Sequence, residues 1–194
     1  YSLKETPKNK KYFKKVKNIL FISNKDVVLT MAKKAEQLNL KSKIYSFKLR
    51  GEAKNVFDLL FKALKDNDII LAGGETTVKL QTANSKEQMV VGKGGRNQEA
   101  VLGAIVKMIH NKKYVMHNCV FLSIASDGRD NTEAAGAISD HLTLEKAKKL
   151  KLSPEKFLEE HNSFNFFKKT GDLIYADQNS FNVSDFMVLL KSKE

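Results

Sequence analysis

Three polar, glycine-containing loops carry the residues best able to do chemistry in this 194-residue chain: 73–77, 92–99 and 126–130. Glycine lets the backbone adopt positive φ and come close to a ligand, and free N–H groups at the start of a helix bind anions. Two arginines and four acidic residues stand within these loops. The loops therefore indicate phosphate handling, with a metal ion as a further candidate ligand.

Arg96 is the first candidate for a catalytic residue. It follows Gly94 and Gly95 and precedes a predicted helix, whose positive end would add to its charge. Its guanidinium can donate two parallel hydrogen bonds to a phosphate or a carboxylate. A structural ion pair with Glu75 or Glu99 would explain the same residue.

Two carboxylates, Glu75 and Asp127, each follow a predicted strand. Open parallel sheets bind ligands at the carboxyl ends of their strands. Glu75 could orient a hydroxyl or hold a metal ion, and Asp127 could accept a substrate proton or bind Mg²⁺. The alternative for each is a loop residue that accepts hydrogen bonds from nearby amides. For Asp130 we favour a structural cap, because Asp130-x-x-Glu133 has capping-box spacing.

Several well-known sites are absent from the sequence. It has no Gly-x-x-x-x-Gly-Lys-Ser/Thr phosphate loop, and the segment 92–97 lacks the third glycine of the dinucleotide fingerprint. The four histidines are dispersed, with neither a His-x-x-x-His nor a Cys-x-x-Cys spacing, which argues against a zinc centre.

The elements that must position these loops follow an α/β pattern. Short apolar runs at 19–22, 44–47 and 69–72 read as strands, and amphipathic helices are expected between them. This order predicts parallel strands with right-handed crossovers. Further elements are expected as a hairpin over 76–80 and 89–91, helices at 97–110, 143–151, 154–160 and 163–170, and strands at 120–125, 173–175 and 186–190.

We therefore expect an α/β fold in three layers, with a mostly parallel or mixed sheet and helices on both faces. One domain over residues 18–194 would follow a basic, mobile arm at 1–17. Gly136, within Ala134-Ala135-Gly136-Ala137, is expected to permit close helix packing rather than to contact a ligand.

Composition narrows the class of protein. The net charge of +12 comes partly from seven lysines in residues 1–18, without a nucleic-acid-binding signature, so we expect no specific nucleic-acid partner. No apolar stretch reaches about 18 residues, so we expect no membrane span. Cys119, the single cysteine, lies in an apolar run; we expect it to be buried, in a chain from a reducing cytoplasm.

The loops resemble those of the glycerate 2-kinase family whose members end in a MOFRL domain. The residues that carry the resemblance are Gly73-Gly74-Glu75-Thr76-Thr77-Val78, Gly94-Gly95-Arg96-Asn97-Gln98-Glu99, Ser126-Asp127-Gly128, Ala134-Ala135-Gly136-Ala137 and Asn182-Val183 with Asp185. Weaker similarity covers most of residues 19–190. The resemblance implies ATP-dependent phosphorylation of D-glycerate to 2-phosphoglycerate with Mg²⁺, in a cleft between two α/β domains.

By position, the resemblance implies that Arg96 contacts phosphate or the substrate carboxylate, while Glu75, Asn97 and Asp127 line the cleft. For Asn97, an N-cap of the long helix is an adequate alternative. The residues expected to bind substrate or phosphate are Gly73, Gly74, Thr76, Gly94, Gly95, Asn97 and Asn182. Asp127 is the candidate metal ligand.

The sequence departs from the family at three places. The larger N-terminal domain has no counterpart, the loop 177–181 has no glycine, and Asn131 stands after Asp130 where the family has a second glycine. We therefore expect a C-terminal kinase portion that depends on a missing N-terminal domain in cis or in trans. A non-catalytic nucleotide- or anion-binding module is the main alternative, and hydroxypyruvate reduction is a weaker one.

Overall fold

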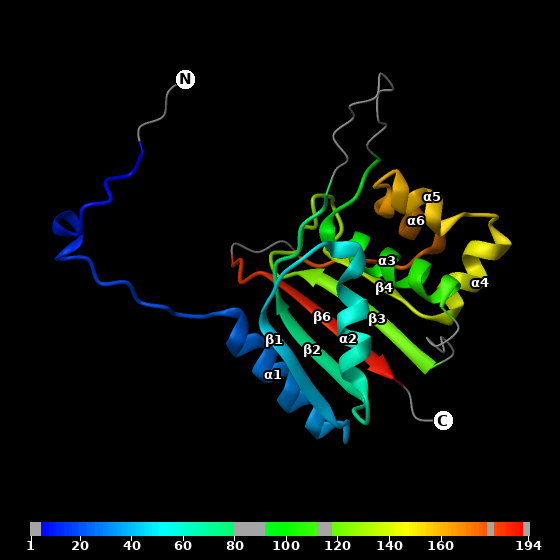
Figure 1. Cartoon of the computed structure of the whole chain (residues 1–194), viewed down its shortest axis with the longest axis horizontal. Coiled ribbons are helices and arrows are strands. Elements are labelled where there is room, and N and C mark those ends of the chain that lie inside the picture. The colour runs from blue at the N-terminus through cyan, green and yellow to red at the C-terminus, as the bar shows by residue number, and fades with distance from the viewer. Residues whose placement is uncertain (1–4, 80–91, 112–117, 178–180, 192–194) are drawn as a thin grey trace.

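The protein is described by a computed structural model that covers residues 5–79, 92–111, 118–177 and 181–191 (Figure 1). Its centre is a sheet of six strands in the order β1-β2-β6-β3-β4-β5. The strands are β1 (Ser42–Leu49), β2 (Ile69–Gly74), β3 (Cys119–Ala125), β4 (Gly136–Ser139), β5 (Leu173–Ile174) and β6 (Asp185–Lys191).

The last strand of the chain lies in the middle of the sheet. β1 and β2 are parallel, whereas β6 is antiparallel to both of its neighbours, β2 and β3. β2 and β3 therefore point the same way, and their carboxyl ends meet the start of β6 at one edge. Gly74, Asp185 and Ala125 stand in register there.

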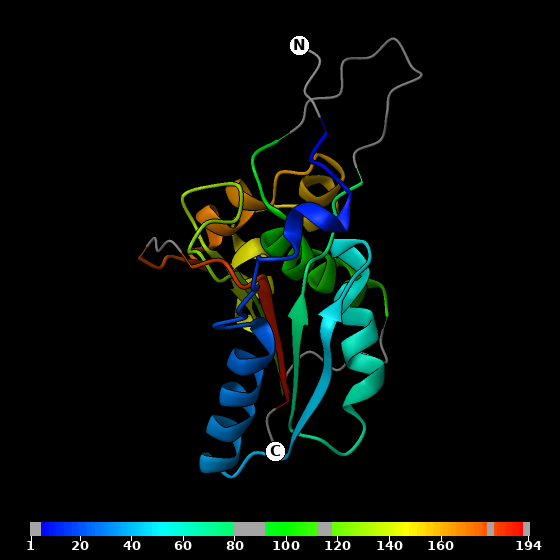
Figure 2. The same ribbon diagram turned by 90° about the vertical axis from the view of Figure 1, so that its left-hand side faces the viewer.

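Helices cover both faces of this sheet, as Figure 2 shows. One face carries α1 (Asn24–Gln37), which packs Val28, Ala32 and Ala35 against Ile69, Leu71 and Phe186. The larger core lies on the other face, beneath the remaining helices. These are α2 (Val56–Leu64), α3 (Arg96–His110), α4 (His141–Lys149), α5 (Pro154–Glu159) and α6 (Ser163–Thr170), with the short 3₁₀ turn η2 (Ala53–Asn55) before α2. A second 3₁₀ turn, η1 (Lys10–Phe13), lies before α1 and has no buried residue.

The three-layer α/β architecture with a mixed sheet is confirmed. The expectation of successive parallel crossovers is wrong, because among the strands that the structure describes only β1 and β2 pair in parallel, and the other four pairings are antiparallel. The hairpin expected over 76–80 and 89–91 falls largely outside the described residues. Helix α3 and strands β1, β2, β3 and β6 lie where the sequence predicts them, within about two residues.

Two local expectations are wrong. The segment Ile19-Leu20-Phe21-Ile22 is not a strand, and its side chains are exposed. Gly136 begins β4 instead of packing between helices, and a methyl group there would overlap the carbonyl oxygen of Ser123 on β3. A residue without a Cβ atom is therefore needed where β4 approaches β3 at this position.

Two expectations from composition can be compared with the structure. Cys119 is buried at the start of β3, where burial raises the pKa of its thiol. Within the described ranges, none of the helices has the length and apolar character needed to cross a bilayer.

Candidate functional site

The three predicted loops converge at the sheet edge where β2 and β3 end and β6 begins. They surround a pocket of about 760 Å³, a volume suited to a small ligand. Its lining combines charged, amide and glycine residues: Glu75, Thr76, Thr77, Val78, Gly92, Gly94, Gly95, Arg96, Glu99, Asp127, Arg129, Asp130, Asn131, His161 and Asn182.

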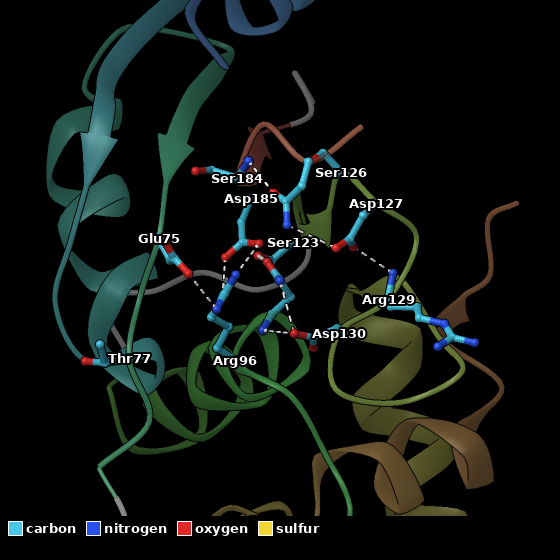
Figure 3. Close-up of polar contacts among 12 residues, drawn as sticks. Glu75, Thr77, Arg96, Ser123, Ser126, Asp127, Arg129, Asp130, Ser184 and Asp185 are labelled. Carbon is cyan, nitrogen blue, oxygen red and sulfur yellow. Dashed lines mark hydrogen bonds and ion pairs between the residues drawn. The ribbon is translucent and has the colours of Figure 1, made fainter. Parts of the chain in front are cut away.

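Arg96 lies between two carboxylates in this pocket (Figure 3). Its Nε donates to Asp185 Oδ2 at 2.6 Å and its Nη2 to Asp185 Oδ1 at 3.2 Å, while Nη1 lies 2.9 Å from Glu75 Oε1. Asp185 is 1% exposed, whereas the Arg96 side chain keeps 33% of its surface. The hydrogen bonds that Arg96 donates to Asp185 hold the pKa of Arg96 above its usual range, so the guanidinium stays charged.

The amino end of α3 is capped by Asp130, a residue from the third loop. Asp130 Oδ1 accepts from the Asn97 amide at 3.0 Å and from Asn97 Nδ2 at 3.1 Å, and Oδ2 accepts from the Gln98 amide at 2.8 Å. These amides are the donors that a phosphate would bind at a helix start. The anion at this helix end is therefore a side chain of the protein itself.

Asp130 is thus a cap, as expected, but of a different helix. The predicted capping box with Glu133 is wrong, because no helix begins at Asp130. The carboxylate is 3% exposed, and burial raises its pKa to about 6 against the opposing hydrogen bonds from Gln98 and Asn97. The alternative of Asn97 as N-cap is also wrong, since Gly95 takes that position.

The glycines of the loops face protein atoms at close range. A methyl group at Gly95 would overlap the backbone and carboxylate of Asp130, and one at Gly94 would overlap Ser163 Oγ. At Gly74 it would overlap the backbone of Leu49 on β1. These glycines therefore allow the loops to pack against neighbouring segments, which is a structural reason for their presence.

The third loop is held to the segment before β6. Asp127 Oδ2 accepts from Asn182 Nδ2 at 3.1 Å, and Asp127 Oδ1 accepts from the Arg129 amide at 3.1 Å. Ser126 Oγ accepts from the Val183 amide at 2.9 Å. Asp127 is therefore oriented at the pocket wall, and within the described part of the chain each of its oxygens accepts one of these two hydrogen bonds, which leaves acceptor capacity for a ligand.

A buried acid and a histidine form another wall of the pocket. Glu99, in the first turn of α3, places Oε2 at 2.8 Å from Nδ1 of His161, and the two side chains are 4% and 10% exposed. Burial raises the pKa of Glu99, and the hydrogen bond from His161 opposes this. The neighbouring segment is tied to the second loop, because the Gly92 amide donates to the Glu160 carbonyl at 2.8 Å.

Most of the predicted site residues lie at this edge. Lining the pocket are Arg96, Asp127, Glu75, Thr76, Gly94, Gly95 and Asn182. Gly73 and Gly74 end β2 behind this lining. Asn97 is fully buried, where it accepts a hydrogen bond from Ser123 Oγ and donates to Asp130.

Among the residues of the site that the sequence analysis did not predict as site residues are Asp185, Arg129 and His161. Asp185 carried a signal, because it is an acid directly before the apolar run 186–190 at a predicted strand start. Arg129 belongs to the third loop, and Figure 3 shows its guanidinium pointing away from Arg96. His161 gave no sequence signal, since its partner Glu99 is 62 positions away.

The oxygen atoms that line the pocket fit a magnesium ion in one binding mode, in which substrate and water supply most of the ligands. Across the described ranges, no three His, Cys, Asp or Glu side chains converge as a protein cage for a metal would require. Mg²⁺ is commonly held by one or two carboxylates together with substrate phosphates and water. Asp127, with its free acceptor capacity, suits that mode, whereas Glu75 is engaged by Arg96.

The chain is similar in sequence and in fold to glycerate kinases. Residues 68–185, more than half of the chain, match the MOFRL family. The chain is 30% identical over 186 residues to the glycerate 2-kinase of Pyrococcus horikoshii, covering 90% of this chain and 39% of that protein. It is 38% identical over 125 residues to the glycerate kinase of Danio rerio, covering 62% and 23%.

A solved structure shows the same fold. The crystal structure of a glycerate kinase from Thermotoga maritima superposes with a TM-score of 0.74 and 26% identity, over 88% of this chain and 41% of that one. This chain thus spans about two fifths of the length of the Pyrococcus and Thermotoga proteins. The family match includes all three loops of the site, and the chain belongs to the MOFRL family.

Proposed function

We propose that this chain is the C-terminal portion of a glycerate 2-kinase and forms one wall of its active site. The observation that supports this most is that Arg96, Asp127 and Arg129 line one pocket, from loops that resemble those of the kinases. In the reaction, the 2-hydroxyl oxygen of D-glycerate bonds to the γ-phosphorus of ATP. The bond from that phosphorus to the bridging oxygen breaks, ADP leaves, and the hydroxyl proton passes to a base.

Each residue has a role consistent with its surroundings. Phosphoryl transfer depends mainly on positioning and on neutralising charge. Arg129 is the exposed cation that can reach a phosphate, and Arg96 can donate its remaining N–H groups to a substrate carboxylate or phosphate. Asp127 can accept the hydroxyl proton or hold Mg²⁺, and Asp185 positions Arg96. The ion would neutralise phosphate charge when bound.

The second wall would come from an N-terminal kinase domain, in cis or in trans. The relatives support this, because the Pyrococcus protein extends well beyond the 39% that this chain covers. Glycerate and ATP would bind between the two parts, so the chain by itself is expected to have little or no turnover.

A chimaera tests the proposal. In it, this chain replaces the matching part of the Pyrococcus horikoshii glycerate 2-kinase, and ADP release is measured with and without D-glycerate. We expect turnover that requires glycerate, falls at least 100-fold in Arg96→Ala, and stays within twofold in Lys148→Ala on α4. A folded chimaera that releases no ADP would reject the kinase proposal. Full activity of the Arg96→Ala variant would reject the role assigned to Arg96.

A non-catalytic nucleotide- or anion-binding module remains the second candidate, and one observation favours it. Asp130 occupies the amides at the start of α3, and Arg96 already binds two carboxylates, so part of the apparent phosphate cradle is satisfied internally. ATP binding by the chimaera without turnover would support this module. Incubation of the same chimaera with NADH and hydroxypyruvate tests the reductase alternative.

A further inference from the structure

The segment Ile19-Leu20-Phe21-Ile22 is an apolar stretch that the rest of the described chain does not cover. These side chains are 76%, 80%, 89% and 41% exposed. Figure 1 shows the chain before α1 leading away from the body of the protein. Four consecutive large apolar side chains exposed in this way mark a surface that another element covers.

The sequence of this segment is that of a strand buried on both faces. It is a continuous apolar run of β-branched, aromatic and leucine residues, without the alternation of a half-exposed strand. Yet no strand in the part of the chain that the structure describes pairs with it. The sequence of the segment thus predicts a buried strand, whereas the described structure leaves it exposed and unpaired. A sheet in another part of the protein would explain this difference.

The carboxyl end of the segment is fixed to the body of the protein. Ser23 and Asp26 form a capping box at the start of α1, and Asn24 Nδ2 donates to the Phe47 carbonyl at 2.8 Å. Helix α1 itself is anchored through fully buried Val28. The segment therefore leaves from a defined point on the α1 side of the sheet.

The chain's own sheet edge is a poor match for this segment. β1 lies at that edge, and its residues alternate between exposed and part-buried over most of its length. A strand added to β1, from this chain or from a second copy, would have one face in water. An apolar run without alternation is instead typical of strands inside a sheet that is covered on both sides.

We propose that Ile19–Ile22 is a β-strand that inserts into a sheet of the remaining part of the glycerate kinase, in cis or in trans. The relatives indicate this partner, because they extend beyond the 39% and 41% of their length that this chain matches. The inference rests on the proposed function, since it takes the partner to be the rest of that kinase. Main-chain pairing would give affinity, and the four side chains would fill both covered faces.

Amide hydrogen exchange in the chimaera tests this proposal. In the isolated 194-residue chain we expect the amides of Leu20, Phe21 and Ile22 to exchange nearly as fast as in an unfolded peptide. In the chimaera we expect them to slow by at least about 100-fold, as strand hydrogen bonds inside a sheet do. The exposed turn Lys10–Phe13 is the internal control and should exchange fast in both proteins.

Matched variants separate docking from folding. Phe21→Asp should lower the melting temperature of the chimaera and abolish the protection, while the melting temperature of the isolated chain stays unchanged because Phe21 is exposed there. Leu38→Asp, at a position 58% exposed just after α1, should change neither protein.

The outcomes distinguish this inference from the kinase proposal. Protection without ADP release would keep the docking strand and reject the kinase, whereas turnover with unprotected amides would keep the kinase and overturn the docking strand. Protection already present in the isolated chain would overturn the proposal: self-association removed by Phe21→Asp would identify a second copy, and a monomer would identify an internal site. If the chimaera failed to fold while the intact Pyrococcus protein folded under the same conditions, the rest of the glycerate kinase would also be rejected as the partner of this segment.

Discussion

Arg96 and Asp185 form a two-point ion pair that joins the start of α3 to the start of β6. The Nε–Oδ2 distance is 2.6 Å and the Nη2–Oδ1 distance is 3.2 Å. The two residues are 89 positions apart, yet Asp185 is in register with Gly74 and Ala125. The pair thus fixes Arg96, a candidate catalytic residue, to β6, which lies between β2 and β3, the strands that precede the other two loops.

Asp185→Asn is expected to destabilise the chain by about 2 kcal/mol. Removing one partner of a buried ion pair costs about 3–5 kcal/mol, and the partial exposure of Arg96 reduces this through solvent screening. The free energy of unfolding in urea measures the effect. Asp58→Asn is the matched control, because it breaks the more exposed Lys62–Asp58 pair and should cost at most about 1 kcal/mol. Equal losses in both variants would contradict the structural weight given to Asp185.

Asp130 makes stability depend on pH. Its pKa is about 6 in the folded protein and about 3.9 in an unfolded chain, so the folded state binds the proton more tightly. The stability of the protein relative to Asp130→Asn should therefore be greatest below about pH 4 and fall as pH rises through about 6. The total change is about 3 kcal/mol.

Urea unfolding of both proteins between pH 4 and pH 7 measures this difference. The variant keeps one oxygen, which can accept from either the Asn97 or the Gln98 amide, while its NH2 group loses the other hydrogen bond at every pH. Glu99, whose pKa is also raised, titrates in both proteins. A difference between the two proteins that does not vary with pH would contradict this prediction, because it would mean that the hydrogen bonds to Asp130 fully offset the effect of its burial on the pKa.

Two glycines expected to bind phosphate should respond differently to alanine. At Gly95 the methyl group would overlap the Asp130 backbone, which cannot move without displacing the α3 cap, so Gly95→Ala should cost at least about 2 kcal/mol. At Gly73 the nearest atom is Cγ2 of Val28 at 3.0 Å, a side-chain atom with some freedom to shift. Gly73→Ala should therefore cost less, and equal melting temperatures for the two variants would contradict this account of the loops.

The sequence alone predicted the layers of the fold better than the strand pairing. Apolar runs and helical periodicity located α3, β2, β3 and β6, because burial pattern and local preference agree in these segments. Pairing depends on contacts between distant segments, and nothing local indicates that β6 inserts between β2 and β3. The segment 19–22 gave a wrong prediction for a different reason: its apolar pattern predicts a buried strand, whereas the described part of the chain leaves its side chains exposed.

The candidate site shows the same division. Glu75, Arg96 and Asp127 were recognisable because each lies in a polar loop beside a strand or a helix start. The partners of the charged residues in those loops could not be predicted, because the cap of α3 comes from Asp130, 33 positions after Asn97. Partners this far apart are set by tertiary packing, and a local motif such as Asp130-x-x-Glu133 then gives the wrong helix.

The relative roles of the two pocket arginines give the last prediction. Arg96 is engaged by Asp185 and Glu75, whereas the Arg129 side chain is exposed and points away from that cluster (Figure 3). In the chimaera, Arg129→Ala should therefore raise the KM for ATP at least 10-fold, because an exposed guanidinium that binds phosphate contributes mainly to ground-state binding. The effect should weaken as salt is raised, since exposed charges are screened.

Arg129→Lys is the matched variant, because it keeps the charge but loses the planar pair of donors. It should recover part of the affinity and leave a measurable deficit. Steady-state kinetics at two salt concentrations would separate these cases. An unchanged KM in Arg129→Ala, with a large loss in Arg96→Ala, would mean that the nucleotide phosphates bind beside Arg96 and that one of its carboxylate partners moves when they do.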